Sequence, residues 1–151
     1  MSTELQVTVF RFAKEEYALP ITKVKSIIKL LPITKMPNAP LFVEGIINLR
    51  GEIIPIVDLR PRFNLSIQPA TDESRIIIVD INQQMVGIIV DCVDEVIRVP
   101  MDDIDLPPAA ARLDTTYITG ICKYNLRLIT LLDIDKVLTQ DEVKDLKKVD
   151  G

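Results

Sequence analysis

Short runs of Val, Ile and Leu recur along the whole chain, and Gly, Pro, Asn or Asp separates each run from the next. Apolar runs of about four to eight residues with such boundaries are typical of β-strands. Some runs alternate with polar side chains, as around Thr8 and Arg11, whereas residues 76–79 are apolar throughout and should be buried on both faces. The pattern predicts an all-β protein.

The chain also aligns with itself in two blocks without gaps. Residues 7–28 lie over residues 76–97, and residues 42–59 lie over residues 117–134. In both copies of the first block, a β-branched strand is followed by a polar turn and a second strand. In the second block an aromatic residue, a glycine and an aspartate coincide. Self-similarity of this kind predicts an internal duplication.

The duplication divides one domain into two repeats. Gly45 coincides with Gly120 in the alignment, and Asp58 coincides with Asp133. The stretch between the repeats is poor in apolar residues and is expected to connect them. We therefore expect a single domain over residues 1–151, with a first repeat over about 7–63, a connection over about 64–74 and a second repeat over about 75–138.

Each repeat is expected to contribute about five strands to a small barrel. A sheet of this length cannot bury a flat face alone, and closure into a barrel also removes its edges. Two barrels side by side could share a third apolar layer, which would explain strands that are apolar on both faces. The terminal strands could pack with their own repeat or cross to the other one, and the pattern is compatible with both.

Helices are expected to be few and short. Asp58 and Asp133 each follow a predicted strand and resemble N-caps that open short helices. Residues 139–142 have the spacing of a capping box, and apolar side chains then recur at helical spacing. The sequence predicts a C-terminal helix over about 139–148.

One strong apolar run, residues 42–59, is interrupted in its middle by a charged tight turn. Residues 49–52 suit a tight connection between strands over 45–49 and 53–57, with Gly51 supplying a positive φ. Arg50 could be a solvated turn residue or a cation held out for a partner. Its matched position is Asn125, so the turn occurs in both repeats, whereas the guanidinium occurs only in the first.

Composition argues against most catalytic chemistry. The chain contains no histidine, the commonest general base and metal ligand near neutral pH. The acidic segment 102–105 lacks the glycine and the distal glutamate of a calcium loop. We expect no catalytic, cofactor-binding or metal-binding residue. The isolated glycines suit strand interiors or turns rather than a phosphate loop: Gly45, Gly51, Gly87 and Gly120.

Charge and hydropathy indicate which partners and cellular environment the protein is expected to have. The net charge is −4 and the pI is about 4.9, which argues against nucleic-acid binding. No apolar run approaches the roughly 18 residues of a membrane span. We expect a soluble, cytoplasmic protein without direct membrane contact. Cys92 and Cys122 are expected to be small buried hydrophobic residues rather than a disulfide.

The run F-V-E-G-I-I-N-L-R-G-E-I-I-P-I-V-D-L at 42–59 resembles the CheW family of chemotaxis coupling proteins. The same holds for E-E-Y-A-L-P-I-T-K-V at 15–24, Val86–Asp91 and Tyr117–Ile121. The N-L-R-G-x-x-x-P-x-x-D-L element is specific, and the resemblance covers about Gln6 to Asp141. It implies two intertwined five-stranded SH3-like barrels with a shared hydrophobic core.

The resemblance also implies a function without enzymatic activity. Proteins of this family act as scaffolds that couple transmembrane chemoreceptors to the histidine kinase CheA, and so control kinase activity and array assembly. The implied partners are the helical cytoplasmic tip of the receptors and the regulatory domain of CheA. The isolated protein is expected to be a monomer that is recruited to membrane receptor arrays.

The implied partner-binding residues fall in two places. Arg50 matches the family arginine implicated in partner binding, and Asn48 belongs to the same N-L-R-G element. A receptor-facing groove between the barrels would map to Val24, Ile27 and Val96.

The chain departs from the family pattern at one position near this groove. Some family members carry an acidic residue just before the matched isoleucine, where this chain has Ser26, and the repeat mate of Ser26 is Glu95. An ion pair between that acid and Arg50 is therefore not expected here.

Two other interpretations fit parts of the sequence. The same fold could be the regulatory domain of a kinase or the coupling half of a protein with a phosphoreceiver domain, but the chain begins and ends close to its predicted strands. A barrel that binds a small ligand, or an enzyme using carboxylates near 91–95, is a third interpretation. A thermal-shift screen with metals and metabolites would separate it, because an adaptor should show no response.

Overall fold

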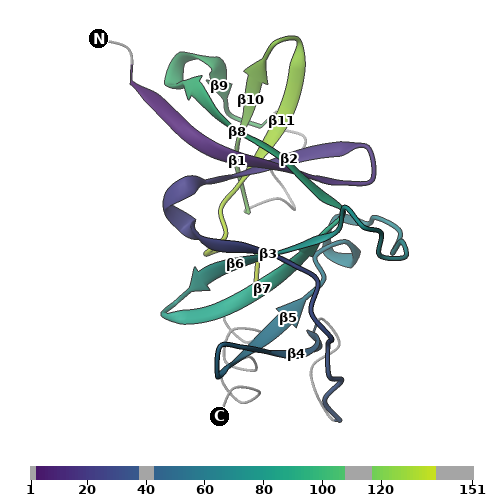
Figure 1. Ribbon diagram of the computed structural model, residues 1–151. Helices are drawn as coiled ribbons and strands as arrows, with labels where there is room; N and C mark the ends of the chain where they lie inside the picture. The colour runs from purple at the N-terminus through teal and green to yellow at the C-terminus, as the bar shows by residue number, and fades with distance from the viewer. Residues whose placement is uncertain (1–2, 38–42, 108–116, 139–151) are drawn as a thin grey trace.

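The computed structural model describes residues 3–37, 43–107 and 117–138, which form two antiparallel-rich sheets stacked one above the other (Figure 1). The six-stranded sheet has the order β8 (Cys92–Pro100), β1 (Glu4–Phe12), β2 (Glu15–Pro20), β11 (Arg127–Leu132), β10 (Ile118–Tyr124) and β9 (Ile104–Asp105). The five-stranded sheet has the order β3 (Val24–Lys29), β6 (Arg75–Ile81), β7 (Gln84–Val90), β5 (Glu52–Val57) and β4 (Val43–Leu49). Three single-turn 3-10 helices connect strands: η1 (Ile21–Lys23), η2 (Pro61–Phe63) and η3 (Met101–Asp103).

The two sheets exchange strands between the repeats. The first two strands of the chain, β1 and β2, pair with β8 and β11 of the second repeat. In the same way β6 and β7 pair with β3 and β5 of the first repeat. Each sheet therefore combines a hairpin from one repeat with strands from the other, which confirms the intertwined all-β fold and decides that the leading hairpins cross over.

The repeat in the sequence is a repeat in the structure. Strands β4 and β5, moved by 75 residues, coincide at every terminus with β10 and β11. The parallel pairs β2–β11 and β5–β7 are likewise equivalent. Even the short strand β9 has a counterpart. Asp105 of β9 pairs with Ile121, and Thr34 forms an isolated bridge with Ile46, which is the mate of Ile121. A pseudo-twofold axis therefore relates the two sheets.

The described residues form three apolar clusters, and the largest lies between the sheets. It combines Phe10, Phe12 and Leu19 of the six-stranded sheet with Ile77 and Val79 of the other. Each sheet also curls around a cluster of its own, so that its two edge strands meet across an apolar interior. This arrangement confirms the shared apolar layer that the sequence predicted.

The uniformly apolar run at 76–79 illustrates why one strand needs apolar residues on both faces. Ile77 and Val79 point into the layer between the sheets, whereas Ile76 and Ile78 point into the interior of the five-stranded sheet. All four side chains are fully buried. Full burial of an Ile or Val side chain contributes about 1.5–3 kcal/mol.

The predicted helices need two corrections. Asp58 is not an N-cap, because η2 begins after Arg60 and the Asp58 carboxylate instead accepts the Arg60 amide in a local turn, at 3.0 Å. Asp133 makes the equivalent turn by accepting the Asp135 amide at 3.1 Å, and no helix follows it within the described residues. Both aspartates sit where a strand leaves its sheet, and a two-residue turn satisfies the freed amide. The predicted helix over 139–148 lies outside the described residues.

Gly45 and Gly120 occupy matching register shifts in β4 and β10. A Cβ on Gly45 would overlap the carbonyl oxygen of Thr34, and the residue has a φ of +154°. A Cβ on Gly120 would lie 2.8 Å from Cγ2 of Ile104 and 3.0 Å from the backbone carbonyl oxygen of Asp105, and Gly120 does not have the positive φ of Gly45. The first site therefore combines a backbone clash with strain, whereas at the second the shortest contact is with a side chain and the backbone contact is longer.

We expect Gly45→Ala to destabilise the protein more than Gly120→Ala. The Gly45 variant should lose about 2 kcal/mol or more of unfolding free energy, because the bridge between Thr34 and Ile46 must open. Urea unfolding of both variants followed by circular dichroism measures the difference. Equal losses at the two sites would contradict the role given to the Thr34 contact.

The two cysteines are free and buried, as predicted. Burial raises the pKa of the Cys122 thiol to about 11, and burial is also the main cause that raises the pKa of Cys92. At pH 8 only about one Cys122 thiol in a thousand would be ionised, and the thiolate is the reactive form.

We therefore expect the Cys122 thiol not to react with a thiol reagent at pH 8 in the folded protein. Both cysteines should react within minutes after unfolding in guanidinium chloride. With a disulfide reagent that releases a coloured thiolate on reaction, the absorbance measures the number of accessible thiols. Rapid labelling of Cys122 in the folded state would show that its cluster opens readily.

Candidate partner-binding surfaces

The turn between β4 and β5 is a tight two-residue connection that holds Arg50 at its tip. Arg50 has a φ of 54° and Gly51 a φ of 88°, and Leu49 pairs directly with Glu52. Two successive positive φ values are the mark of a type I′ hairpin turn. The Asn48 side chain closes the turn by accepting the Gly51 amide at 2.9 Å.

The equivalent turn in the second repeat has the same backbone but a different chemistry. Asn125 and Leu126 have φ values of 48° and 66°. Leu126 is fully exposed there, whereas the first repeat has glycine. The backbone of both tips is therefore fixed by the fold, and only the side chains distinguish them.

Arg50 is exposed and makes no hydrogen bond or ion pair with any residue that the structure describes. Ile53, one residue into β5 and paired with Asn48, is 43% exposed. A free guanidinium next to an exposed apolar side chain is a combination found at protein–protein contacts.

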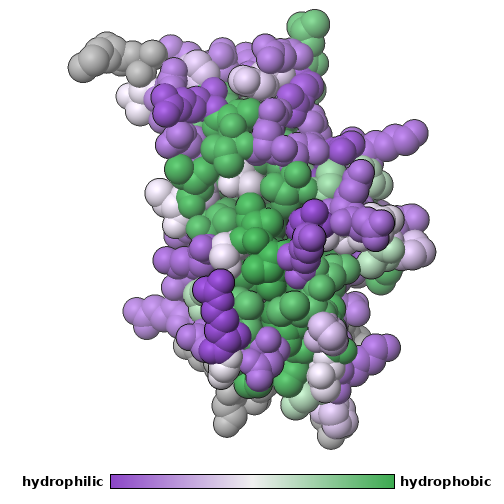
Figure 2. Space-filling model, in the orientation of Figure 1, coloured by the Kyte–Doolittle hydropathy of each residue, from purple (hydrophilic) through white to green (hydrophobic). Residues whose placement is uncertain are grey.

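Val24, Ile27 and Val96 lie on the two strands related by the pseudo-twofold axis. Val24 on β3 and its mate Val93 on β8 both pack against the cluster between the sheets. Farther along the same strands, Ile27 is 40% and Val96 57% exposed. Figure 2 shows, on the side of the molecule seen in Figure 1, a band of apolar side chains that runs along its length with hydrophilic side chains on both flanks.

The strand directions bring the Arg50 turn and the start of β3 to the same end of the five-stranded sheet. Strand β5 is parallel to β7, β6 is antiparallel to β7, and β3 is antiparallel to β6. Strand β3 therefore begins at the end where the β4–β5 turn lies (Figure 1). No hydrogen bond or ion pair between described residues joins the turn to β3.

In the six-stranded sheet, a three-residue ionic network lies at the start of β11, which is the counterpart of the start of β5 next to the Arg50 turn. Arg127 binds Glu16 through two contacts of 2.7 and 3.1 Å, and its third contact, of 3.0 Å, is to Glu95. These hydrogen bonds raise the pKa of Arg127. Glu95 is the repeat mate of Ser26, so the acid missing from the first repeat is present in the second and already has an arginine partner.

Arg60 forms a buried ionic node that no motif in the sequence marks. Its guanidinium donates to Asp58 at 2.8 Å, to Asp91 at 3.2 Å and to the Gln68 carbonyl at 3.2 Å. The hydrogen bonds with Asp58 are the main cause that raises its pKa. Asp91 lies between β7 and β8, so the node ties the first repeat to the crossover between the sheets. Only the short D-L-R spacing could have suggested the local half of this node.

The equivalent node across the pseudo-twofold axis has reversed charge and is exposed. Asp135 takes the place of Arg60 and binds Lys23 at 2.9 Å. The side chains of that pair are 43% and 40% exposed, against 7% and 4% for Arg60 and Asp58. Exposed pairs contribute little, but a buried charge that loses its partner is costly.

We expect Arg60→Ala to cost about 3–5 kcal/mol of unfolding free energy, because Asp58 would remain buried without a counterion. Lys23→Ala, the matched change at the exposed node, should cost less than about 1 kcal/mol. Chemical denaturation of both variants gives the comparison. Similar losses would show that burial does not govern the strength of these nodes.

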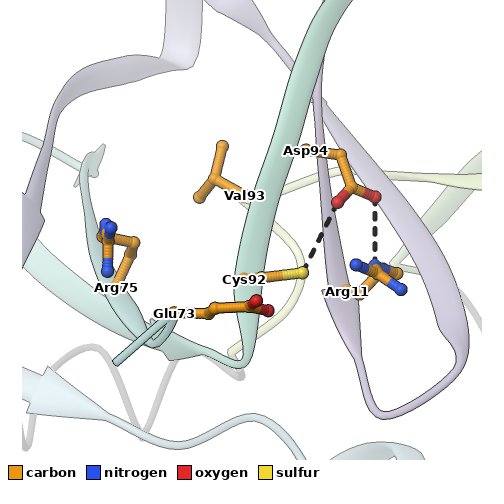
Figure 3. A pocket seen from close by; sticks show the side chains of 6 residues that line it. All are labelled: Arg11, Glu73, Arg75, Cys92, Val93 and Asp94. Atoms are coloured by element: carbon orange, nitrogen blue, oxygen red, sulfur yellow. Dashed lines mark hydrogen bonds and ion pairs between the residues drawn. The ribbon is translucent and has the colours of Figure 1, made fainter. Parts of the chain in front are cut away.

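Two cavities lie near these features. The larger, about 280 Å³, is lined by Arg11, Glu73, Arg75, Cys92, Val93 and Asp94 (Figure 3). Asp94 accepts a weak bond from the Cys92 thiol at 3.5 Å and pairs with Arg11 at 3.1 Å. The smaller, about 200 Å³, lies beside the Arg60 node. Over the described ranges, no group of three or more metal-binding side chains converges.

The chain is similar over most of its length to proteins of one family. A family model described as a CheW-like domain matches residues 6–142. The chemotaxis protein CheW of Bacillus subtilis is 38% identical over 142 residues, which cover 93% of this chain and 91% of that protein. The chemotaxis protein CheW of Helicobacter pylori is 35% identical over 137 residues, covering 91% and 83% of the two chains.

A solved structure agrees with these sequence matches. The crystal structure of the scaffolding protein CheW from Thermoanaerobacter tengcongensis superposes with a TM-score of 0.84 and 39% sequence identity. The match covers 93% of this chain and 96% of that chain.

The fold consists of two intertwined β-rich subdomains, and it exposes Arg50, Ile27 and Val96 on its surface. This combination is typical of a scaffold for protein–protein contacts. More particularly, the chain belongs to the CheW family, whose members are non-catalytic scaffold proteins of chemotaxis. It is therefore an adaptor and not an enzyme. Among the described helices, none is long and apolar enough to cross a membrane.

Proposed function

We propose that this protein couples transmembrane chemoreceptors to the regulatory domain of the histidine kinase CheA, and thereby controls kinase activity and array assembly. The observation that carries the proposal is Arg50, an exposed cation on a rigid turn without a partner among the described residues. The protein would act in the cytoplasm as a monomer until receptor arrays recruit it. It would need no cofactor and no direct contact with membrane or nucleic acid.

The turn suits Arg50 to a role in binding. Its backbone is fixed by paired strands and by the Asn48 side chain, so binding does not have to order a flexible loop. A guanidinium offers five N–H donors in a planar fork, and truncation of such anchors is among the costliest changes at interfaces.

The apolar surface around Ile27 and Val96 suits a different partner. Amphipathic helices bury their apolar face in a groove and leave charged side chains at its rim. Ile27, Val96 and the half-buried Val24 offer such a surface on the pseudo-twofold axis. We assign it to the helical tip of the receptors, whereas the barrel ends would contact the kinase domain.

We expect Arg50→Ala to leave the fold intact, because Arg50 makes no hydrogen bond or ion pair with any described residue. The variant should bind the receptor tip or the kinase domain about tenfold or more weakly, because it lacks the guanidinium anchor. The matched control is Asn125→Ala at the equivalent tip, which should have little effect on the contact made by the Arg50 tip. Co-sedimentation with a soluble receptor tip and with the CheA regulatory domain, together and singly, measures both.

The outcomes separate the parts of the proposal. Unaltered binding of Arg50→Ala to both partners would remove Arg50 from the interface. If the unsubstituted protein captured neither partner, the coupling function itself would be wrong.

A further inference from the structure

The surface around Ile27 and Val96 is nearly symmetric, which raises the question of how a helix would bind it in one direction. The pseudo-twofold axis exchanges β3 with β8, Val24 with Val93 and Ile27 with Val96. An apolar stripe with this symmetry would accept an amphipathic helix equally well in either of two opposite directions. Hydrophobic burial is non-directional and cannot remove that degeneracy.

Two charged positions break the symmetry. Both strands carry a register shift at the same place: Lys25 is skipped between Val24 and Ser26 on β3, and Asp94 is skipped in the pairing of β8 with β1. Lys25 and Asp94 are repeat mates and both residues are exposed. A cation on one strand therefore stands where an anion stands on the other.

The next pair of mates reinforces the difference. Ser26 on β3 is neutral, whereas Glu95 on β8 is a carboxylate whose side chain is 45% exposed. The two-residue segment of β3 carries one positive charge, and that of β8 carries two negative charges. The following mates that are charged, Lys29 and Arg98, have the same sign and do not discriminate.

Ion pairs within the protein hold the two carboxylates in place. Arg127 forms two hydrogen bonds with Glu16 and one with a single carboxylate oxygen of Glu95. The other oxygen of Glu95 remains available to a donor on the partner helix. Asp94 is held by Arg11 at 3.1 Å. Lys25 makes no ion pair within the part of the chain that the structure describes.

We infer that Lys25 on β3 and Asp94 with Glu95 on β8 select the direction in which an amphipathic partner helix lies across the Ile27–Val96 surface. The end of the helix that carries acidic side chains would lie near Lys25, and the end that carries basic side chains near Asp94 and Glu95. The inference rests on the proposed function, because it concerns the receptor helix assigned to this surface. Charge complementarity fixes register and suppresses wrong arrangements in this way at other interfaces.

The test is a transposed variant that exchanges the two charged segments. It carries Lys25→Asp and Ser26→Glu on β3, with Asp94→Lys and Glu95→Ser on β8. Arg127 keeps its two contacts with Glu16, whereas Arg11 loses its ion pair with Asp94 and faces the new lysine, so circular dichroism must first show that the variant is folded. The probe is a soluble chemoreceptor-tip fragment with a spin label near one end of its contact helix. Paramagnetic broadening of backbone amide signals reports whether the label lies near β3 or β8.

We expect the label to broaden one strand in the unsubstituted protein and the other strand in the transposed variant. The affinities of the two proteins should agree within about threefold, because the same charges are presented with the ends exchanged. The preference should weaken as salt is raised, since the charges are exposed.

Two one-sided variants serve as matched controls. Lys25→Asp with Ser26→Glu makes both strands acidic, and Asp94→Lys with Glu95→Ser makes both strands basic. Each restores the symmetry, so the label should broaden β3 and β8 to similar extents and the affinity should fall severalfold.

The results distinguish this inference from the function on which it rests. If the unsubstituted protein failed to bind the receptor tip, the proposed function would fail. If it bound and the transposed variant showed broadening on the same strand as before, the function would stand and the directional role of these charges would be refuted.

Discussion

The apolar layer between the two sheets is the constraint on which the rest of the structure depends. It takes side chains from strands of both repeats, such as Phe10 and Leu19 from the first and Ile77 and Val79 from the second. Because the leading hairpin of each repeat pairs with strands of the other, neither sheet can be completed by one repeat alone. The surfaces proposed to bind partners lie on a body whose two sheets fold together, so their relative position is set by this layer.

The duplication supplies a symmetric scaffold, and function is best sought where the symmetry fails. Both hairpin tips have the same positive-φ backbone, but one presents Arg50 and the other Leu126. The node around Arg60 is buried, whereas its counterpart at Asp135 is exposed. The equivalent segments of β3 and β8 carry opposite charge. Backbone geometry follows the repeat because strand pairing and packing fix it, while exposed side chains can differ at little cost in stability.

The sequence indicated the strands, the repeat and the shared layer because they depend on local patterns. Short β-branched runs with turn residues at their ends show strands directly, and the doubly apolar run at 76–79 showed a strand with two buried faces. The predictions that Asp58 and Asp133 are N-caps were wrong because they also depended on local pattern. An aspartate after a strand can precede either a helix or a local turn, and the sequence around it looks the same in both cases. The node of Arg60 with Asp91 could not be foreseen, because its residues are separated by 31 positions and charge patterns do not reveal such pairs.

By itself, then, the sequence determined an all-β chain with a duplicated pattern, a tight turn carrying Arg50 and membership of a non-catalytic scaffold family. Only the tertiary structure decided that the leading hairpins cross between the sheets, that Glu95 is already held by Arg127 and that Arg50 has no partner among the described residues. The physical reason is the range of the interactions. Strand propensity and turn geometry act between neighbours in the chain, whereas strand exchange and ionic contacts join distant residues that meet only after the core has formed.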